Sequence, residues 1–278
     1  MKEINYDEIV SKVKEGYIKA CKILPQNIKN IFRSALESEE NLLAKVVLEV
    51  LLKNAEIAEK EGLPLCQDTG IPVVWVKIGE KIKVRNLEKA INEGLELAYK
   101  EGLLRASVCD PLTRKNTGTN TPGVIHYELV PEDILELFLM PKGCGSENMS
   151  RLAMLSPSAG IEGIKKFVIE TVKKAGPNPC PPVVVGIGIG GDFEKSAILA
   201  KKALFRELGK SNADPKIEKL EKELFSEINS LGIGPLGFGG KTTCLAVHIE
   251  TYPCHIASLP VAVNIQCHSI RNVKIKLL

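Results

Sequence analysis

The sequence predicts an α+β protein in which a helical N-terminal region packs on a mixed, largely antiparallel β-sheet core. Two observations lead to this fold class. Residues 1–62 carry apolar side chains at helical spacing, whereas the C-terminal third alternates apolar and polar side chains as strands do. No internal repeat, low-complexity tract or clear linker interrupts the chain. We therefore expect one domain over 1–278, with helices over 1–62 and an α+β part over 63–278.

The composition is that of an ordinary soluble globular protein, with 44% hydrophobic and 26% charged residues. The net charge is +3, and acidic and basic residues are interspersed without a basic block, so nucleic-acid binding is not indicated. The N-terminus is charged and lacks the apolar stretch of a signal peptide, and no run approaches the roughly 18 apolar residues of a membrane span. We expect a cytoplasmic protein that does not bind membranes.

The N-terminal region has the pattern of three helices. Apolar residues recur at helical spacing over 4–24, and Pro25 ends that stretch. Residues 26–61 predict two further helices, with Gly62 as the stop. None of the three carries an obvious chemical signature, so this region is expected to support a site rather than to form one.

The next part of the chain alternates helix and strand signals with polar loops. A strand over 71–79 follows the loop "LPLCQDTG", and residues 86–102 predict a helix capped by Asn86. Residues 105–123 form a long polar segment, and such a segment inside a compact domain is usually functional or disordered. Two strand-like runs follow, and we expect them to pair as an antiparallel hairpin: "VIHYELV" and "ILELFLMPKG".

The C-terminal half begins with "GSENMSRLAML", which is expected to start a helix. Residues 160–175 and 214–230 predict amphipathic helices, and the last 45 or so residues are rich in strand signals. Between the two helices, a buried strand enters a glycine-rich turn and a further helix, "CPPVVVGIGIGGDFEKSAILAKKALFREL".

The "GIGIGG" turn matches a dinucleotide-binding pattern but lacks its confirming feature. Gly186, Gly188 and Gly191 satisfy G-x-G-x-x-G between a strand and a helix. About 20 residues further on, a second strand should end in Asp or Glu, and the chain there is helical or polar loop instead. Close packing of strand against helix is favoured, and a nucleotide- or anion-binding module stays as the non-enzymatic alternative.

Eight cysteines are present, and no two form a C-x-x-C pair. Zinc ribbons, thioredoxin-like chemistry and clusters bound by one short run are therefore disfavoured. Cys66, in "LCQDTG", is either a buried thiol beside a turn or a thiolate ligand. Cys144 lies between Gly143 and Gly145, where a core residue is unexpected, and is a candidate nucleophile or metal ligand.

Two Cys-His pairs near the C-terminus suggest a metal site. Cys254-His255 and Cys267-His268 recur thirteen residues apart. Their spacing is not that of a zinc finger. Cys267 ends an apolar strand and precedes a polar turn, which is where a strand-borne ligand would face a cleft. A zinc protein is therefore a further interpretation that the residues alone leave open.

Five long motifs together resemble one family. The chain is similar, from about residue 5 to its end, to the class I (iron–sulfur) fumarate hydratase family, and more narrowly to α subunits of two-subunit fumarases and L(+)-tartrate dehydratases. The motifs are "LPLCQDTGIPVVWVKIG", "LRASVCDPLTRKNTGTNTPGVIH", "MPKGCGSENMSRLAMLSPSAG", "VVVGIGIGGDFEKSAILAKKAL" and "FGGKTTCLAVHIETYPCHIASLPVAVNIQCHSIR".

The resemblance implies a [4Fe–4S] cluster held by Cys66, Cys144 and Cys267, the cysteines at the matching positions. Single-chain members carry the middle cysteine a few residues upstream, so Cys144 fits a two-subunit pattern. Three protein ligands leave one iron open, and an open metal site acts as a Lewis acid. The other cysteines are assigned to packing: Cys21, Cys109, Cys180, Cys244 and Cys254.

The resemblance also implies a reaction and its residues. The expected activity is the reversible hydration of fumarate to (S)-malate, with dehydration of L(+)-tartrate to oxaloacetate as the alternative. Asp68 and His255 are expected to be catalytic, while Gln67, Arg105 and His255 are expected to bind the C4 dicarboxylate, Arg105 as a bidentate partner. The family's C-terminal domain corresponds to a β subunit. We expect that partner to supply the base within an oxygen-sensitive α2β2 assembly.

Overall fold

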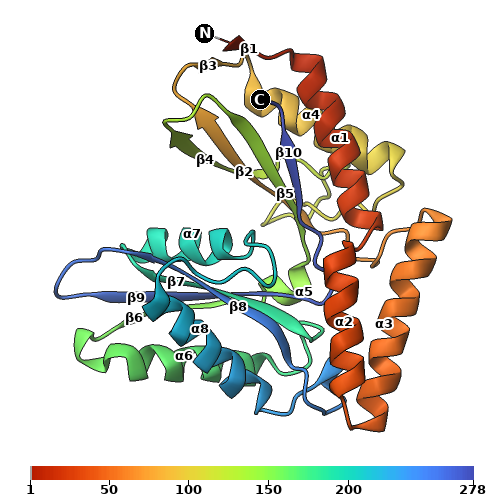
Figure 1. Cartoon of the computed structure of the whole chain (residues 1–278). Coiled ribbons are helices and arrows are strands. Elements are labelled where there is room, and N and C mark those ends of the chain that lie inside the picture. Colours follow the sequence, from red (N-terminus) through yellow and green to blue (C-terminus); the bar gives the residue numbers. More distant parts are fainter. Residues whose placement is uncertain (1) are drawn as a thin grey trace. The chain divides into compact units, whose positions relative to one another are not determined.

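The structure is a computed structural model that describes residues 2–278 (Figure 1). Contacts divide the chain into two compact units. Unit 1 takes the chain up to Pro25, Asn54–Cys144 and Arg271–Leu278. Unit 2 takes Gln26–Lys53 and Gly145–Ile270. The structure combines helices with mixed sheets, as the sequence predicts.

Unit 1 contains a four-stranded sheet in the order β10-β5-β2-β4. Its strands are β2 (Ile71–Gly79), β4 (Val124–Val130), β5 (Leu135–Lys142) and β10 (Val273–Lys276). β2 pairs in parallel with β4 and antiparallel with β5, and β5 pairs antiparallel with β10. A short parallel pair, β1 (Lys2–Glu3) with β3 (Ile82–Lys83), lies apart from this sheet.

The predicted hairpin between β4 and β5 is wrong, because β2 lies between the two strands. The short link from β4 to β5 passes over the end of β2, at Gly79. A Cβ added at Gly79 would lie 2.1 Å from the backbone oxygen of Glu132, so only glycine fits there. The sequence pattern cannot reveal this insertion, because β2 is distant along the chain.

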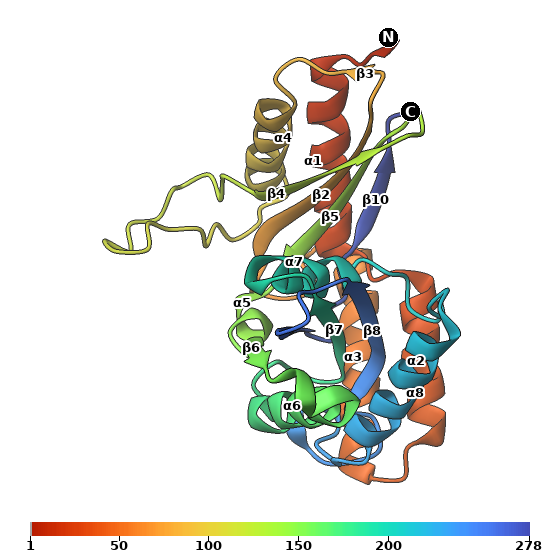
Figure 2. The same cartoon turned by 90° about the vertical axis from the view of Figure 1, so that its left-hand side faces the viewer.

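Two helices cover one face of this sheet, α1 (Tyr6–Lys22) and α4 (Leu87–Glu101) (Figure 2). Their buried residues, with those of β2 and β5, form the unit 1 core.

The predicted side-chain cap of α4 is wrong: Asn86 adopts a left-handed conformation, with φ of 54°, and makes no capping hydrogen bond. The polar segment between α4 and β4 extends from the unit as a long loop (Figure 2).

Unit 2 contains a second four-stranded sheet in the order β6-β9-β7-β8. Its strands are β6 (Arg151–Leu155), β7 (Val183–Gly190), β8 (Cys244–Tyr252) and β9 (Leu259–Gln266). β9 pairs antiparallel with β6 and β7, and β7 pairs in parallel with β8. The helix predicted from "GSENMS" is a single turn, α5 (Cys144–Glu147), and the chain then enters β6.

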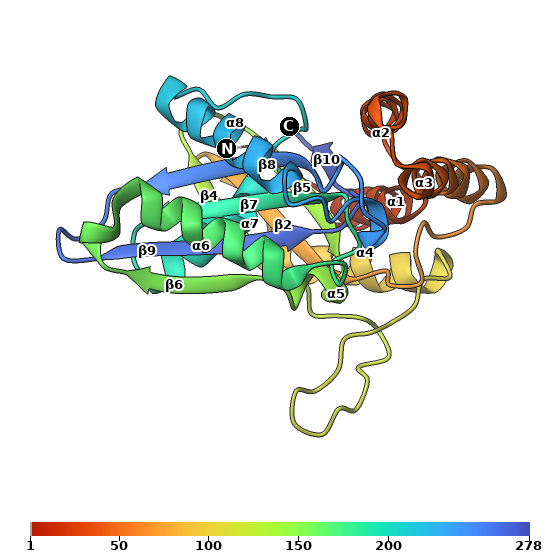
Figure 3. The same ribbon diagram turned by 90° about the horizontal axis from the view of Figure 1, so that it is seen from below.

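Helices cover both faces of the unit 2 sheet. α6 (Gly160–Ala175) and α8 (Pro215–Asn229) lie on one face, and α7 (Phe193–Ala203) lies on the other (Figure 3). Short 3-10 turns occur at Pro157–Ala159 and Pro235–Gly237. α2 (Gln26–Ser38) belongs to unit 2, and α3 (Leu42–Glu61) contributes its residues up to Lys53. No helix within residues 2–278 combines the length and the apolar character needed to cross a membrane.

The "GIGIGG" motif packs β7 tightly against α7. A Cβ added at Gly188 would lie 2.0 Å from the Ser196 backbone oxygen, and one at Gly186 would lie 2.4 Å from that of Ala200. The Asp192 side chain caps α7 by accepting a hydrogen bond from the Lys195 N–H. These contacts confirm that the motif serves close packing of strand against helix. The N-terminus of α7 is already capped by the Asp192 carboxylate.

Candidate active site

In unit 1, Asp68 links two of the three cysteines that the sequence singles out. The Asp68 N–H donates to Cys66 Sγ at 3.4 Å, and Asp68 Oδ2 accepts the Cys144 N–H at 2.8 Å. Asp68 Oδ1 accepts the Gly70 N–H at 2.9 Å. Cys66 and Cys144 lie 78 positions apart in the sequence (144 − 66) and are brought together around a single residue.

Arg271 holds the same loop from within unit 1. Its side chain is 1% exposed, and its Nη1 donates to the Asp68 carbonyl oxygen. A Cβ added at Gly143 would lie 3.3 Å from both Arg271 Nη2 and Asp68 Oδ2, so a larger residue would press on both groups. Sequence reasoning missed Arg271, although it closes the "CHSIR" motif that contains Cys267.

Buried polar side chains also hold the loop that contains Cys66 in place. Tyr99 Oη donates to the carbonyl oxygens of Thr69 and Gly70, each at 2.9 Å, and lies 2.8 Å from Tyr17 Oη. Asn120 Nδ2 donates to the same Gly70 oxygen at 3.1 Å. Burial raises the pKa of Tyr17 and Tyr99, so both phenols keep their protons and act as donors at physiological pH.

The predicted substrate-binding residues of unit 1 border this loop. Gln67 Oε1 lies 3.3 Å from Cys66 Sγ, and its side chain is exposed. The Arg105 backbone oxygen accepts the Thr69 hydroxyl at 2.8 Å, which places Arg105 beside the Cys66 loop with its side chain exposed. The structure therefore brings one thiol, one amide and one guanidinium residue to the same part of unit 1.

Cys267 belongs to unit 2, where it follows the last residue of β9 and is half-buried. The next residue, His268, contacts the segment that precedes β7. The His268 N–H donates to the Cys180 backbone oxygen at 3.2 Å, and His268 Nδ1 lies 3.1 Å from the same atom.

Within unit 2, the structure separates His255 from Cys267. His255 lies in the turn between β8 and β9, where its backbone oxygen accepts the Ser258 N–H. β9 is eight residues long, so the His255 turn and Cys267 lie at opposite ends, roughly 26 Å apart. His255 and Cys267 of one chain therefore cannot contact the same small substrate.

The His255 end of the sheet is hollowed and exposes several apolar side chains. His255 lines a cavity of about 340 Å³ with residues of α6 and of the β8–β9 turn. Ile256 beside it is 91% exposed, although it is a large apolar residue. Other exposed apolar residues lie at the same end of these strands and helices: Met154, Ile161, Phe193 and Tyr252. Exposed apolar surface of this kind is typical of a protein interface.

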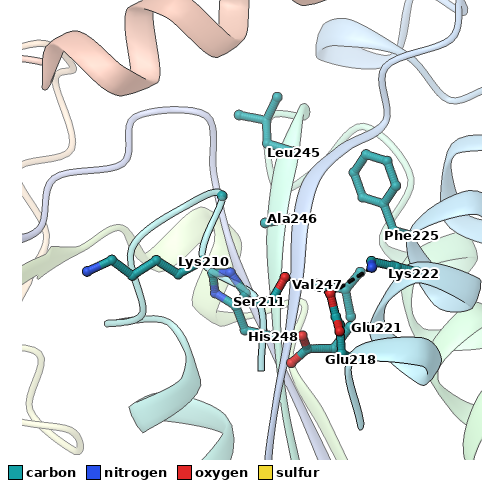
Figure 4. A pocket seen from close by; sticks show the side chains of 11 residues that line it. Lys210, Ser211, Glu218, Glu221, Lys222, Phe225, Leu245, Ala246, Val247 and His248 are labelled. Atoms are coloured by element: carbon teal, nitrogen blue, oxygen red, sulfur yellow. Dashed lines mark hydrogen bonds and ion pairs between the residues drawn. The ribbon is translucent and has the colours of Figure 1, made fainter. Parts of the chain in front are cut away.

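A second cavity of unit 2, of about 220 Å³, lies between α8 and β8 and holds none of the predicted site residues (Figure 4). Glu218 and Lys222 form an ion pair at its rim. His248 contributes to its wall, and burial lowers the pKa of this histidine to about 4, with Arg206 acting in the same direction. The His248 ring is thus neutral near pH 7 and adds no charge to the wall of this cavity.

The other cysteines are only partly explained by packing. Cys21 and Cys244 are buried, which confirms their assignment. Cys109 is half-buried, and Cys180 and Cys254 are exposed, so the assignment to packing is wrong for these last two. No group of three or more His, Cys, Asp or Glu side chains within residues 2–278 is arranged to hold a single metal ion.

The unit 1 residues nevertheless fit an iron–sulfur cluster. Cys66 Sγ accepts a backbone N–H, as cluster thiolates do, and Cys144 is exposed between two residues that carry no side chain. Thiolates are soft ligands that suit iron–sulfur clusters.

The chain belongs to the fumarate hydratase family. The family model described as "Fumarate hydratase (Fumerase)" matches residues 10–276, nearly the whole chain, and class I fumarate hydratases are its members. Membership makes this chain part of a hydro-lyase enzyme.

Several similar proteins share one name, L(+)-tartrate dehydratase subunit alpha, which is more specific than the family description. A Methanocaldococcus jannaschii protein, provisionally named L(+)-tartrate dehydratase subunit alpha, is 46% identical over 97% of this chain and 98% of its own length. The L(+)-tartrate dehydratase subunit alpha of Escherichia coli UTI89 is 31% identical over 98% of this chain and 92% of its own length. The protein of the same name from Escherichia coli K12 is 30% identical over the same shares.

Proposed function

We propose that this chain is the α subunit of a two-subunit iron–sulfur hydro-lyase acting on a C4 dicarboxylate. Fumarate hydration to (S)-malate is the first reaction that the motifs suggest, but the relatives' names favour the alternative, dehydration of L(+)-tartrate to oxaloacetate. The "subunit alpha" in those names supports a β-subunit partner. We propose that this partner completes the site in an α2β2 assembly.

One observation carries the proposal: Asp68 contacts both Cys66 and Cys144 in unit 1. We propose that these two cysteines and Cys267 would hold a [4Fe–4S] cluster. When bound, its open iron supplies a Lewis acid that polarises the hydroxyl group to be lost. The Asp68 contacts join the Cys66 loop to the turn that begins at Cys144, next to the pairing of Ile71 with Lys142 in β2 and β5.

The role proposed for Asp68 is positioning rather than proton transfer. Both of its carboxylate oxygens accept backbone N–H groups, from Gly70 and Cys144, and Arg271 binds its carbonyl oxygen. A carboxylate engaged in this way fixes the two cysteine-bearing segments. We propose that the proton at C3 is removed by a group of the β subunit.

The polar residues beside Cys66 are proposed to bind the substrate. Arg105 carries an exposed guanidinium whose planar fork matches a carboxylate, and Gln67 presents an exposed amide next to Cys66 Sγ. A dicarboxylate presents two anionic ends. We propose that Arg105 and Gln67 orient one end.

His255 can take part only if a second copy supplies it. Its separation from Cys267 along β9 excludes action at the same site of its own chain. The exposed apolar residues around His255 support an interface at that end of unit 2. We propose that His255 reaches the substrate site of another α chain, which agrees with an assembly containing two α chains.

The test is an activity assay on the α chain co-expressed with its β subunit and purified without oxygen. We expect dehydration of L(+)-tartrate, malate or both, with activity lost on exposure to air. The ratio of the two kcat/KM values assigns the substrate. Inactivity towards both substrates, in a complex shown to contain iron and sulfide, would overturn the proposed reaction.

A further inference from the structure

We propose that Cys180 is the disulfide partner of Cys267 when the chain lacks its cluster, so that Cys180 is a redox site of unit 2. This inference rests on the proposed function only in that it takes Cys267 to be a cluster ligand. Cys180 is exposed, and Cys267 is half-buried at the end of β9. Neither the motifs nor the relatives assign a role to Cys180.

Backbone contacts bring the two residues together. The Cys180 carbonyl oxygen accepts the N–H of His268, the residue after Cys267, at 3.2 Å. Each Cα lies roughly 2.4 Å from the bonded atom on its side, so the two Cα atoms are at most about 8 Å apart. Disulfides join cysteines whose Cα atoms are roughly 4.4–6.8 Å apart. The pair is thus within reach after a small local adjustment.

The backbone of Cys180 is held in an unusual conformation at this point. Its φ is 55°, in the left-handed region that residues other than glycine rarely adopt. Its N–H donates to the Pro177 oxygen at 3.0 Å, and His268 Nδ1 lies 3.1 Å from its carbonyl oxygen. Contacts on both sides fix the residue that carries the thiol. Backbone conformations of this kind persist where the surroundings determine them, often at functional positions.

The remaining cysteines of unit 2 are poor competitors for Cys267. Cys244 is buried, and burial raises the pKa of its thiol to about 12, so it forms little thiolate. Cys254 lies in the turn at the far end of β9, where its Sγ donates to the Ser258 oxygen at 3.2 Å. Of the unit 2 cysteines, Cys180 is therefore the one placed to react with Cys267.

The chemistry balances with molecular oxygen as the oxidant. The two S–H bonds of Cys180 and Cys267 break and one S–S bond forms. The two electrons and two protons reduce oxygen to hydrogen peroxide. The disulfide would hold Cys267 in a form that a thiol reductant restores, whereas further oxidation to the sulfinic acid is irreversible for most proteins.

The test uses the full-length chain, freed of metal by chelation and exposed to air. Thiols are alkylated under denaturing conditions, and the digest is analysed by mass spectrometry without reduction. We expect a peptide pair joining Cys180 to Cys267, present in wild type and in Cys254→Ser, and absent from Cys180→Ser. In Cys180→Ser, we expect Cys267 to accumulate as sulfinic or sulfonic acid.

The wild-type digest alone decides the matter, so the result does not depend on the folding of a variant. Cys267 joined to Cys66 or Cys144, or left without any disulfide, would overturn the proposal. The readout is the mass of a peptide from cluster-free protein. Its failure would therefore leave the hydro-lyase proposal standing, and absence of iron from the anaerobic complex would leave the disulfide result standing.

Discussion

Cys66 of unit 1 and Cys267 of unit 2 are positioned by different kinds of interaction. In unit 1, Cys66 lies in a loop held by buried polar side chains, chiefly those of Tyr99, Asn120 and Arg271, whereas Cys144 begins α5 just after β5. In unit 2, Cys267 follows a strand that is paired on both sides, by β6 and by β7. Single side-chain substitutions should therefore loosen the Cys66 loop, whereas the backbone pairing of β9 holds Cys267 in place.

The largest expected effect tests whether the Cys144 thiol is a cluster ligand. Replacing Cys144 by Ser should remove cluster binding, because two thiolates do not retain a cluster that needs three. Iron bound per anaerobically purified complex should fall to background. Cys254→Ser is the matched control, since Cys254 is also exposed, and it should keep the wild-type iron content. Iron loss in the control with retention in Cys144→Ser would reverse the ligand assignment.

The second prediction concerns the stability of unit 2 towards acid. Burial, aided by Arg206, lowers the pKa of His248 from 6.5 to about 4, so the folded state keeps the ring neutral. The unfolded chain takes up the proton below its ordinary pKa. The contribution of His248 to the free energy of unfolding is therefore fully present above pH 6.5 and is lost as pH falls towards about 4. The total loss is about 3 kcal/mol.

Urea unfolding at several pH values measures this loss. The His248→Gln variant keeps a polar group facing the Ala203 oxygen but cannot titrate. We expect its stability to change less than that of wild type between pH 6.5 and 4. If the free energy of unfolding falls equally with pH in both proteins, His248 is not the group that causes the acid-induced loss of stability.

A smaller effect is expected from removing one buried amide in unit 1. Asn120 accepts the N–H groups of Ser107 and Val108 and donates to the Gly70 oxygen. In Asn120→Ala these backbone groups lose their partner, and the free energy of unfolding should fall by about 2 kcal/mol. Hydrogen exchange over residues 66–70 should accelerate. Asn116→Ala, in the exposed part of the same loop, is the control and should leave hydrogen exchange over residues 66–70 unchanged. Faster exchange in both variants would mean that the whole loop, and not Asn120 in particular, holds residues 66–70 in place.

The smallest effect is expected at the tyrosine pair. Tyr99→Phe removes the hydroxyl that donates to Thr69 and Gly70 but leaves the ring packing and the Tyr17 hydroxyl in place. A loss of about 1 kcal/mol in the free energy of unfolding is expected. Thermal unfolding measures it, with the half-exposed Tyr127→Phe as control. An equal loss in both variants would contradict a special role for the buried pair.

Local signals predicted most helices and strands, and long-range pairing accounts for the errors. Helices such as α1 and α8 follow from apolar spacing within their own residues. The insertion of β2 between β4 and β5 depends on residues outside both strands, and no local pattern carries it. Likewise, the single turn α5 ends because the chain enters β6, whose pairing with β9 spans more than 100 residues.

The candidate site was predicted in part for the same reason. Motifs identified Cys66, Gln67, Asp68 and Arg105, which the structure places around one loop. The contacts that hold this loop, from Arg271 to Asp68 and from Asp68 to Cys144, join residues 203 and 76 positions apart. The family resemblance also implied a role for His255 beside these residues, and only the length of β9 reveals that His255 lies far from Cys267.

The iron and sulfide content of the wild-type α/β complex, purified without oxygen, tests the central claim most directly. We expect iron and sulfide in equal amounts, matching one [4Fe–4S] cluster per α chain. A complex that dehydrates its substrate without iron and sulfide, or that contains zinc in their place, would contradict it.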